Sequence, residues 1–250
     1  MASYRKNFPK NSFGKYLNLH FEMLTEIEAI DNFLRELLFD MCIDIEHMAK
    51  TNLMTMITNN SSEDGYSLID EFSRIYPDKF DKIIERFGRS IYQQDMFSKR
   101  NQISIWVFME IIDFGTLISV CEIYFTRYPE DQSAYYKQYK FIKNIRNTCA
   151  HNNVFLINMF DKTMHIPRPD VTTKSYARSM KINAGLVSYL KIIDIVNLFY
   201  VHKQICSIKS NIRRSEEAKK ILEKFDSLEC TSERLEKFFN ILRTCIDYLT

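Results

Sequence analysis

Hydrophobic residues recur at spacings of three and four along most of the chain, which is the period of a helix with one buried face. The clearest stretch runs from about 13 to 60, with polar residues on the opposite face. Its apolar stripe comprises Ile30, Phe33, Leu34, Leu37, Leu38, Met41, Ile45, Met48, Ala49 and Leu53. No Pro or Gly interrupts the pattern between Gly14 and Gly65, so we predict one long N-terminal helix.

Shorter helical patterns follow this helix. We predict helices over 68–75, 79–93, 103–125 in two parts divided at 113–116, 129–151, 185–208 and 216–249. Pro77 suits a first helical turn, and Thr116 and Ser215 are candidate N-caps. The segment 158–183 has no clean period, so we expect an irregular connection there.

The composition favours an all-α protein with one continuous core. Of the 250 residues, 46% are hydrophobic, which is enough for a large buried core. Only 5 Gly and 5 Pro are present, too few for the turns of an all-β fold. We predict a single domain over 1–250, with additional helices over 184–249.

Charge, cysteines and hydropathy exclude several classes of protein. The 34 basic and 32 acidic residues leave a net charge of +2, so any RNA must be held by a local groove. The six cysteines are scattered without metal-ligand spacing, so we predict no metal and no cofactor. No apolar signal core or membrane-spanning window is present. We therefore expect a cytoplasmic protein with no membrane partner.

One short segment combines residues suited to RNA cleavage, the run from Arg146 to His151. Alone, an Arg-x4-His spacing is weak, since chance supplies it about 0.3 times in such a composition. On a helix, however, Asn147 and His151 lie about 40° apart on one face, and the long Arg146 side chain can reach the same place.

These three side chains match the needs of RNA transesterification without a metal. The imidazole of His151 can serve as an acid or a base, and Arg146 can clamp the phosphate as negative charge builds up. Asn147 can orient the imidazole or the phosphate. The alternative is a surface helix whose Arg and His are solvated, or whose His caps a helix C-terminus.

Three ordered blocks of sequence resemble the Abi-like (abortive infection, AbiD/AbiF) family of the HEPN superfamily. The first runs from Phe33 to His47 and the second, Trp106-Val107-Phe108-Met109-Glu110 through Leu117, contains a Phe-Gly-x-Leu element. The third is Ile145-Arg146-Asn147-Thr148-Cys149-Ala150-His151-Asn152. Together the blocks span about 30–158.

The resemblance implies an all-α, HEPN-like helical bundle and an endoribonuclease whose site forms across a homodimer. It implies that Arg146 and His151 are catalytic and that Asn147 supports them. It also implies a role in phage defence or as a toxin, restrained by a partner such as a small noncoding RNA. Relatives often place a basic residue shortly after the histidine, where this chain has Asn152 and Asn153.

Further residues are candidates for supporting roles around the motif. Glu46 and Glu110 lie in the matching blocks, and either carboxylate could orient His151 or pair with Arg146; an ordinary helix-face acid is the alternative. The run from 135 to 143 interleaves bases and aromatics, as in proteins that stack bases and hold phosphates. The candidates for RNA binding are Lys137, Tyr139, Lys140, Lys143 and Asn152.

The sequence thus predicts a metal-independent RNA endonuclease that works as a homodimer on RNA, with no DNA substrate expected. The alternative function is a non-catalytic module in which the same cleft binds a structured noncoding RNA. A helical dimer that senses a phage protein is a third reading, for which the sequence offers no marker.

Overall fold

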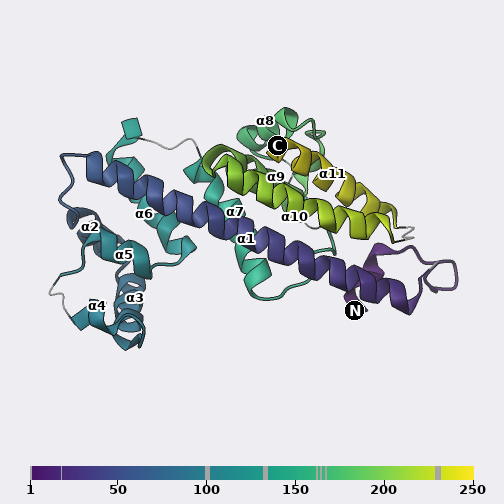
Figure 1. The fold of residues 1–250 in the computed structure, drawn as a ribbon, viewed down its shortest axis with the longest axis horizontal. Helices are drawn as coiled ribbons and strands as arrows, with labels where there is room; N and C mark the ends of the chain where they lie inside the picture. Colours follow the sequence, from purple (N-terminus) through teal and green to yellow (C-terminus); the bar gives the residue numbers. More distant parts are fainter. Residues whose placement is uncertain are drawn as a thin grey trace. The chain divides into compact units, whose positions relative to one another are not determined.

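A computed structural model describes residues 2–17, 19–98, 102–131, 135–161, 163, 165–166, 168–228 and 232–250 (Figure 1). These residues form α-helices, short 3-10 helices and two isolated bridges, and no β-strand occurs among them. The α-helices are α1 (Phe21–Asn59), α2 (Ser67–Ile75), α3 (Pro77–Arg89), α4 (Gln94–Ser98), α5 (Ile105–Ile111), α6 (Phe114–Arg127), α7 (Tyr139–Ala150), α8 (Val171–Ser179), α9 (Leu190–Ile205), α10 (Ile208–Asp226) and α11 (Glu233–Leu249). The 3-10 helices are η1 (Ala2–Asn7), η2 (Pro129–Asp131), η3 (Tyr136–Gln138) and η5 (Leu186–Ser188). The predicted all-α class is confirmed.

The chain divides into two compact units. Unit 1 comprises Met1–Ile45 and Phe141–Thr250, and unit 2 comprises Glu46–Lys140. The boundary passes through α1 and near the start of α7, so both helices contribute residues to both units. The single domain expected over 1–250 stays a prediction.

The long N-terminal helix is confirmed, but it begins at Phe21 and not near Phe13. The residues before it form a tight loop closed by an antiparallel bridge between Lys10 and Tyr16. Gly14 in this loop has a φ of 76°, a backbone conformation that stops a helix from starting here. Within α1 most of the predicted apolar stripe is buried, including Leu34 and Ile45 at 0% exposure, but Phe33 is 42% exposed.

In unit 2, α2 packs on α3, α5 and α6. Pro77 occupies the first turn of α3, as predicted. The predicted division at 113–116 is confirmed, since α5 ends at Ile111 and α6 begins at Phe114. The predicted cap is wrong: Asp113 is the N-cap, and its Oδ1 accepts from the Thr116 backbone N–H at 2.7 Å.

In unit 1, α9 packs against α10 and α11, which also pack against each other (Figure 1). The single closing helix predicted over 216–249 is wrong. α10 is capped by Ser207, whose Oγ accepts from Ser210 N–H, and Ser232 caps α11 in the same way. Ser215, the predicted cap, is buried inside α10. Every serine has the same capping side chain, so the local sequence does not identify which serine is the N-cap of a helix.

Two further boundaries differ from the prediction. The connection expected over 158–183 contains α8, which is capped by Asp170 and buries Thr173, Tyr176 and Ala177. That buried face is too small and too polar to give a hydrophobic period. The helix expected from Pro129 is only the 3-10 turn η2, and the motif helix α7 begins at Tyr139.

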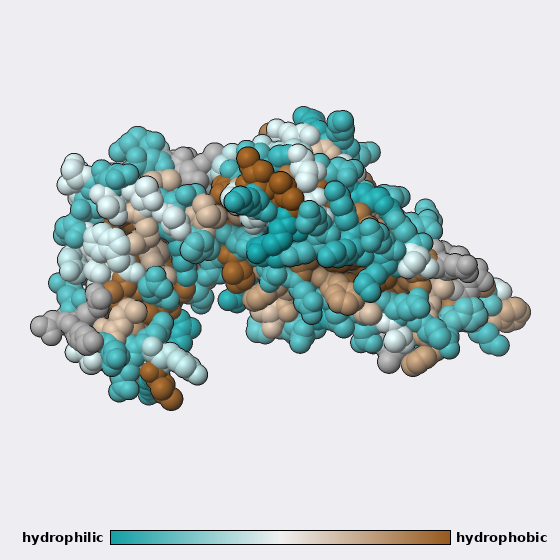
Figure 2. All heavy atoms as spheres, in the orientation of Figure 1, coloured by the Kyte–Doolittle hydropathy of each residue, from teal (hydrophilic) through white to brown (hydrophobic). Residues whose placement is uncertain are grey.

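Hydrophilic residues cover most of the face shown in Figure 2, with hydrophobic residues in small patches. Over the ranges that the structure describes, no helix combines the length and the apolar character needed to cross a bilayer.

Candidate functional site

Arg146 and Asn147 lie in the last turns of α7, and His151 follows its last residue, Ala150. Asn152 follows with a φ of 55°, the left-handed conformation that ends many helices. Its backbone N–H donates to Cys149 O at 3.0 Å, and the N–H of Asn153 donates to Thr148 O at 3.0 Å. This pair of bonds is a Schellman motif, and it fixes His151 at the C-cap position.

Asn147 and His151 are both exposed, one helical turn apart. The His151 backbone N–H donates to Asn147 O at 3.1 Å, so the helical repeat continues through the histidine as the sequence predicts. The opposite face of α7 is packed, with Ile142, Ile145 and Cys149 buried. Burial raises the pKa of the Cys149 thiol to about 12, so this cysteine serves packing and not nucleophilic chemistry.

Arg146 is half-buried, and its Nε is buried without a hydrogen-bond partner among the described residues. Other buried or half-buried arginines are paired with carboxylates: Arg35 with Asp31, and Arg214 with Asp40, Asp44 and Glu217. Leaving a buried donor of a charged group without an acceptor costs free energy. The Arg146 guanidinium therefore has unused capacity for an anion.

The segment after the motif is held by α1. Nη1 of Arg35 donates to Asn152 Oδ1 at 3.0 Å, and its Nε pairs with Asp31 Oδ2 at 3.1 Å. Asp31 is fully buried, and its Oδ1 accepts from the backbone N–H groups of Phe155 at 3.0 Å and Leu156 at 2.7 Å. One buried carboxylate thus links α1 to the chain just beyond His151.

Two more elements anchor the same segment. From the N-terminus, the Tyr4 hydroxyl donates to Asp31 Oδ2 at 2.9 Å and Asn7 Nδ2 donates to Leu156 O at 2.6 Å. From α9, Lys191 Nζ donates to the backbone carbonyls of Phe155 at 2.6 Å and of Ile157 at 2.7 Å. Desolvation lowers the pKa of Lys191 to about 8, although the Asp31 carboxylate opposes this change.

Asp194 of α9 contacts α7 two residues before the motif, at Asn144. Its Oδ1 accepts from Asn144 Nδ2 at 3.4 Å, and burial raises the pKa of this carboxyl to about 8. At neutral pH the group is therefore largely protonated, and it adds little negative charge beneath the motif helix.

Sequence reasoning missed Asp31, Arg35, Lys191 and Asp194. The signal for the first two was present, since an acid and a base four residues apart interrupt the apolar stripe of α1. Nothing in the sequence pointed to α9, because its contact with the segment after His151 is made only by the folded chain.

A family model described as Abi-like protein matches residues 1–157, more than half of the chain. The chain belongs to the Abi-like protein family. Family membership suggests a role in abortive infection, a form of phage defence, and is compatible with a nuclease. No curated protein and no solved structure matches the chain significantly.

The region matched in this Abi-like protein ends just after the anchored segment. It contains Asp31, Arg35 and the whole run from Arg146 to Leu156. The helices from α8 onward lie outside the match, so Lys191 and Asp194 are supplied by the part of the chain that the family model leaves out.

The predicted supporting and RNA-binding residues differ in their exposure and in their contacts. Glu46 of unit 2 pairs with Lys50 at 3.2 Å, and Glu110, also in unit 2, is exposed; their supporting roles stay predictions. Tyr139 does not fit its predicted role, because its ring is 3% exposed, packs on Phe114 and cannot stack on a base. Lys137 and Lys140 are exposed and Lys143 is half-buried, which leaves their role in RNA binding a prediction.

Asn152 also has a structural role, as the residue that ends α7 and accepts from Arg35. Its side chain is exposed, and its predicted contact with RNA stays a prediction.

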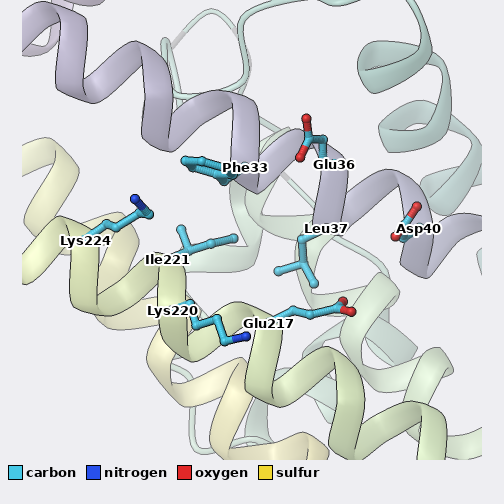
Figure 3. A pocket seen from close by; sticks show the side chains of 8 residues that line it. All are labelled: Phe33, Glu36, Leu37, Asp40, Glu217, Lys220, Ile221 and Lys224. Carbon is cyan, nitrogen blue, oxygen red and sulfur yellow. The ribbon is translucent and has the colours of Figure 1, made fainter.

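A groove of about 350 Å³ lies between α1 and α10 (Figure 3). It is lined by Phe33, Glu36, Leu37, Asp40, Glu217, Lys220, Ile221 and Lys224. On α1, Phe33 and Asp40 point roughly 150° away from Asp31 and Arg35, so the groove is not part of the motif's surroundings. Within the described ranges, no cluster of three or more His, Cys, Asp or Glu could hold a metal ion.

The conformation of Asn152 can be tested by comparing Asn152→Gly with Asn152→Ala. Both variants lose the bond from Arg35, but only glycine adopts the left-handed conformation without steric cost. We expect Asn152→Ala to be less stable than Asn152→Gly by about 1 kcal/mol, measured as the free energy of unfolding in urea. Equal stability of the two variants would show that the φ of 55° does not constrain this position.

Proposed function

We propose that this Abi-like protein is an RNA endonuclease of the HEPN type, acting in phage defence through the Arg146–His151 motif. The observation that carries the proposal is the Arg146 guanidinium, whose buried Nε has no acceptor in the described part of the chain. Buried polar groups are nearly always satisfied, so an orphaned one at a surface motif is best explained by a bound anion. An RNA phosphate is the anion that also explains the neighbouring histidine.

In the proposed reaction, the ribose 2′-oxygen attacks the adjacent phosphorus while the bond from phosphorus to the 5′-oxygen breaks. The 2′-hydroxyl proton passes to an imidazole acting as base, and an imidazolium donates a proton to the leaving 5′-oxygen. The products are a 2′,3′-cyclic phosphate and a 5′-hydroxyl. Arg146 donates to the phosphate oxygens as their charge increases, and Asn147 orients the phosphate or the imidazole.

We propose that the working unit is a homodimer. The reaction uses one base and one acid, and the motif of one chain supplies a single histidine, His151. A second copy facing the first would supply the other imidazole and a second Arg146. The exposed position of Asn147 and His151 at the end of a helix leaves room for this approach.

The proposal is tested by incubating single-stranded RNA with wild-type protein and Arg146→Ala in excess EDTA. We expect wild-type cleavage to persist in EDTA, because every group in the proposed reaction is a side chain. Arg146→Ala should cut about 100- to 1000-fold more slowly, the usual loss when one transition-state donor is removed. Arg178→Ala removes an exposed arginine of α8 and should cut like the wild type.

A substrate with a single 2′-deoxyribose at the cut position should resist cleavage there, because it lacks the attacking oxygen. Loss of wild-type cleavage in EDTA, or cleavage at the deoxyribose, would contradict the mechanism. Binding of RNA without any cutting would instead support the non-catalytic module. We further propose that a small noncoding RNA restrains the activity, which copurification of RNA with the protein would reveal.

A further inference from the structure

The N-terminal segment concentrates positive charge. It contains Arg5, Lys6, Lys10 and Lys15, and the first acidic residue of the chain is Glu22. Without these four bases the rest of the chain has 30 basic and 32 acidic residues, a slight excess of acid. An acid-free, basic segment on a nearly neutral protein favours an anionic partner at this place.

The loop at 9–17 is held in a defined shape by its own bonds. The Asn11 side chain accepts from the backbone N–H groups of Phe13 and Lys15, both at 3.0 Å. In the backbone, the Asn11 N–H donates to Lys15 O at 2.9 Å, and the Gly14 N–H donates to Asn11 O at 3.0 Å. Little ordering entropy remains to be lost when the loop binds a partner.

This shape holds aromatic rings in solvent beside the bases. Phe13 at the tip of the loop is 87% exposed, and Phe21 at the start of α1 is 66% exposed. Lys10 Nζ lies over the ring of Tyr16, 4.8 Å from its centroid. This cation–π contact keeps the ammonium group near the loop. Single exposed apolar residues are common, but two aromatic rings within an acid-free basic segment are a more specific arrangement.

The loop is tied to the segment that follows the catalytic motif. Asn7, two residues before the loop, donates to Leu156 O, and Tyr4 donates to Asp31, which accepts from the N–H groups of Phe155 and Leu156. All of these residues belong to unit 1. The loop and the motif are therefore parts of one bonded framework.

We propose that the loop at 9–17 binds an unpaired RNA strand, with Phe13 stacked on a base and Lys10 and Lys15 on phosphates. Every base has a face on which a ring can stack, and lysines hold the backbone, so such a surface tolerates many sequences. The surface deepens the proposed function, on which it rests, by giving the RNA a contact outside the site of cleavage.

A membrane with acidic lipids and a second copy of the chain are the other partners that a basic, aromatic loop could meet. Phe13 is exposed on a loop and not on the apolar face of an amphipathic helix, the element that usually binds a membrane surface. Against a second copy, Arg5, Lys6, Lys10 and Lys15 would repel the same residues of that copy. RNA offers phosphates to the basic side chains of the loop and bases to its exposed aromatic ring.

The experiment measures binding of a fluorescein-labelled, unstructured RNA by anisotropy in a His151→Ala background, which keeps the RNA intact. Phe13→Ala should weaken binding about tenfold, and Phe13→Trp should restore it. Lys10→Ala/Lys15→Ala should lower the slope of log affinity against log salt by about 1.4, the value for two phosphate contacts on a single strand. A fully paired RNA should lose affinity with the lysine variant but not with Phe13→Ala.

Matched controls separate these effects from general changes. Tyr92→Ala removes a fully exposed aromatic ring of unit 2, and Lys209→Ala/Lys219→Ala removes two exposed lysines of α10. Both should bind RNA like the background protein. The proposal is overturned if Phe13→Ala binds RNA normally, if the controls lose as much affinity, or if Phe13→Ala changes only the oligomeric state or binding to phosphatidylserine vesicles. Because binding is measured without cleavage, a failure here leaves the proposed reaction untouched.

Discussion

His151→Ala is expected to reduce the rate of RNA cleavage by about 100- to 10,000-fold, the range for loss of a catalytic acid or base. The loss should appear in the rate constant of the cleavage step and not in the stability of the fold, because His151 is exposed at the C-cap of α7. The measurement is single-turnover cleavage of a labelled RNA by the variant and the wild type at equal concentrations. In a homodimer, each substitution removes both imidazoles from the shared site.

The control is His47→Ala, which removes another exposed histidine, one that lies on α1. It should cleave RNA at the wild-type rate and unfold at the same urea concentration as His151→Ala. Equal cleavage rates for His151→Ala and the wild type would contradict the proposed mechanism. Loss of activity accompanied by loss of fold would instead assign His151 a structural role.

Asp31→Ala is expected to lower the free energy of unfolding by about 3–5 kcal/mol, as when one partner of a buried ion pair is removed. The substitution leaves three donors without their acceptor: the Tyr4 hydroxyl and the backbone N–H groups of Phe155 and Leu156. Arg35 loses its ion pair with this carboxylate, although its Nε still donates to the Asp31 backbone carbonyl at 3.4 Å. Each such orphaned group adds to the cost. Urea unfolding followed by circular dichroism measures the change.

Asp31→Asn keeps one acceptor oxygen, so its loss of stability should lie between those of Asp31→Ala and the wild type. This variant keeps the test informative if Asp31→Ala fails to fold. The matched control is Glu36→Ala, which removes an exposed acid from the same helix and should change stability by less than about 0.5 kcal/mol. If Asp31→Ala is no less stable than Glu36→Ala, the carboxylate does not hold the segment after the motif.

The position of the motif on its helix could be predicted from the sequence, because it depends on local geometry. Asn147 and His151 lie one turn apart wherever a helix forms, and the backbone bond between them confirms it. The packing of Ile142 and Ile145 follows from the same period. The termination of α7 at Asn152 could not be predicted with equal certainty, since asparagine is only one of several residues that tolerate a positive φ.

Helix boundaries were harder to predict wherever several residues offer the same chemistry. Ser207 and Ser215 are equally good caps in isolation, and Thr116 competes with Asp113. The choice depends on which alternative buries more apolar surface in the folded chain. In α10, Asn211, Arg214 and Ser215 are buried, so a helix beginning at 216 would lose the packing of these residues.

The all-α class, the long N-terminal helix, the membership of the Abi-like family and the residue types of the motif could all be predicted from the amino-acid sequence. These follow from periodicity and from residue types at fixed spacing, which are properties of neighbouring residues. The folded chain was needed to show that Arg146 Nε has no acceptor among the described residues and that Asp31, Arg35 and Lys191 hold the segment after His151. Those facts depend on groups more than 30 residues apart meeting in a low-dielectric interior, where an unpaired donor is costly and a paired carboxylate stabilising.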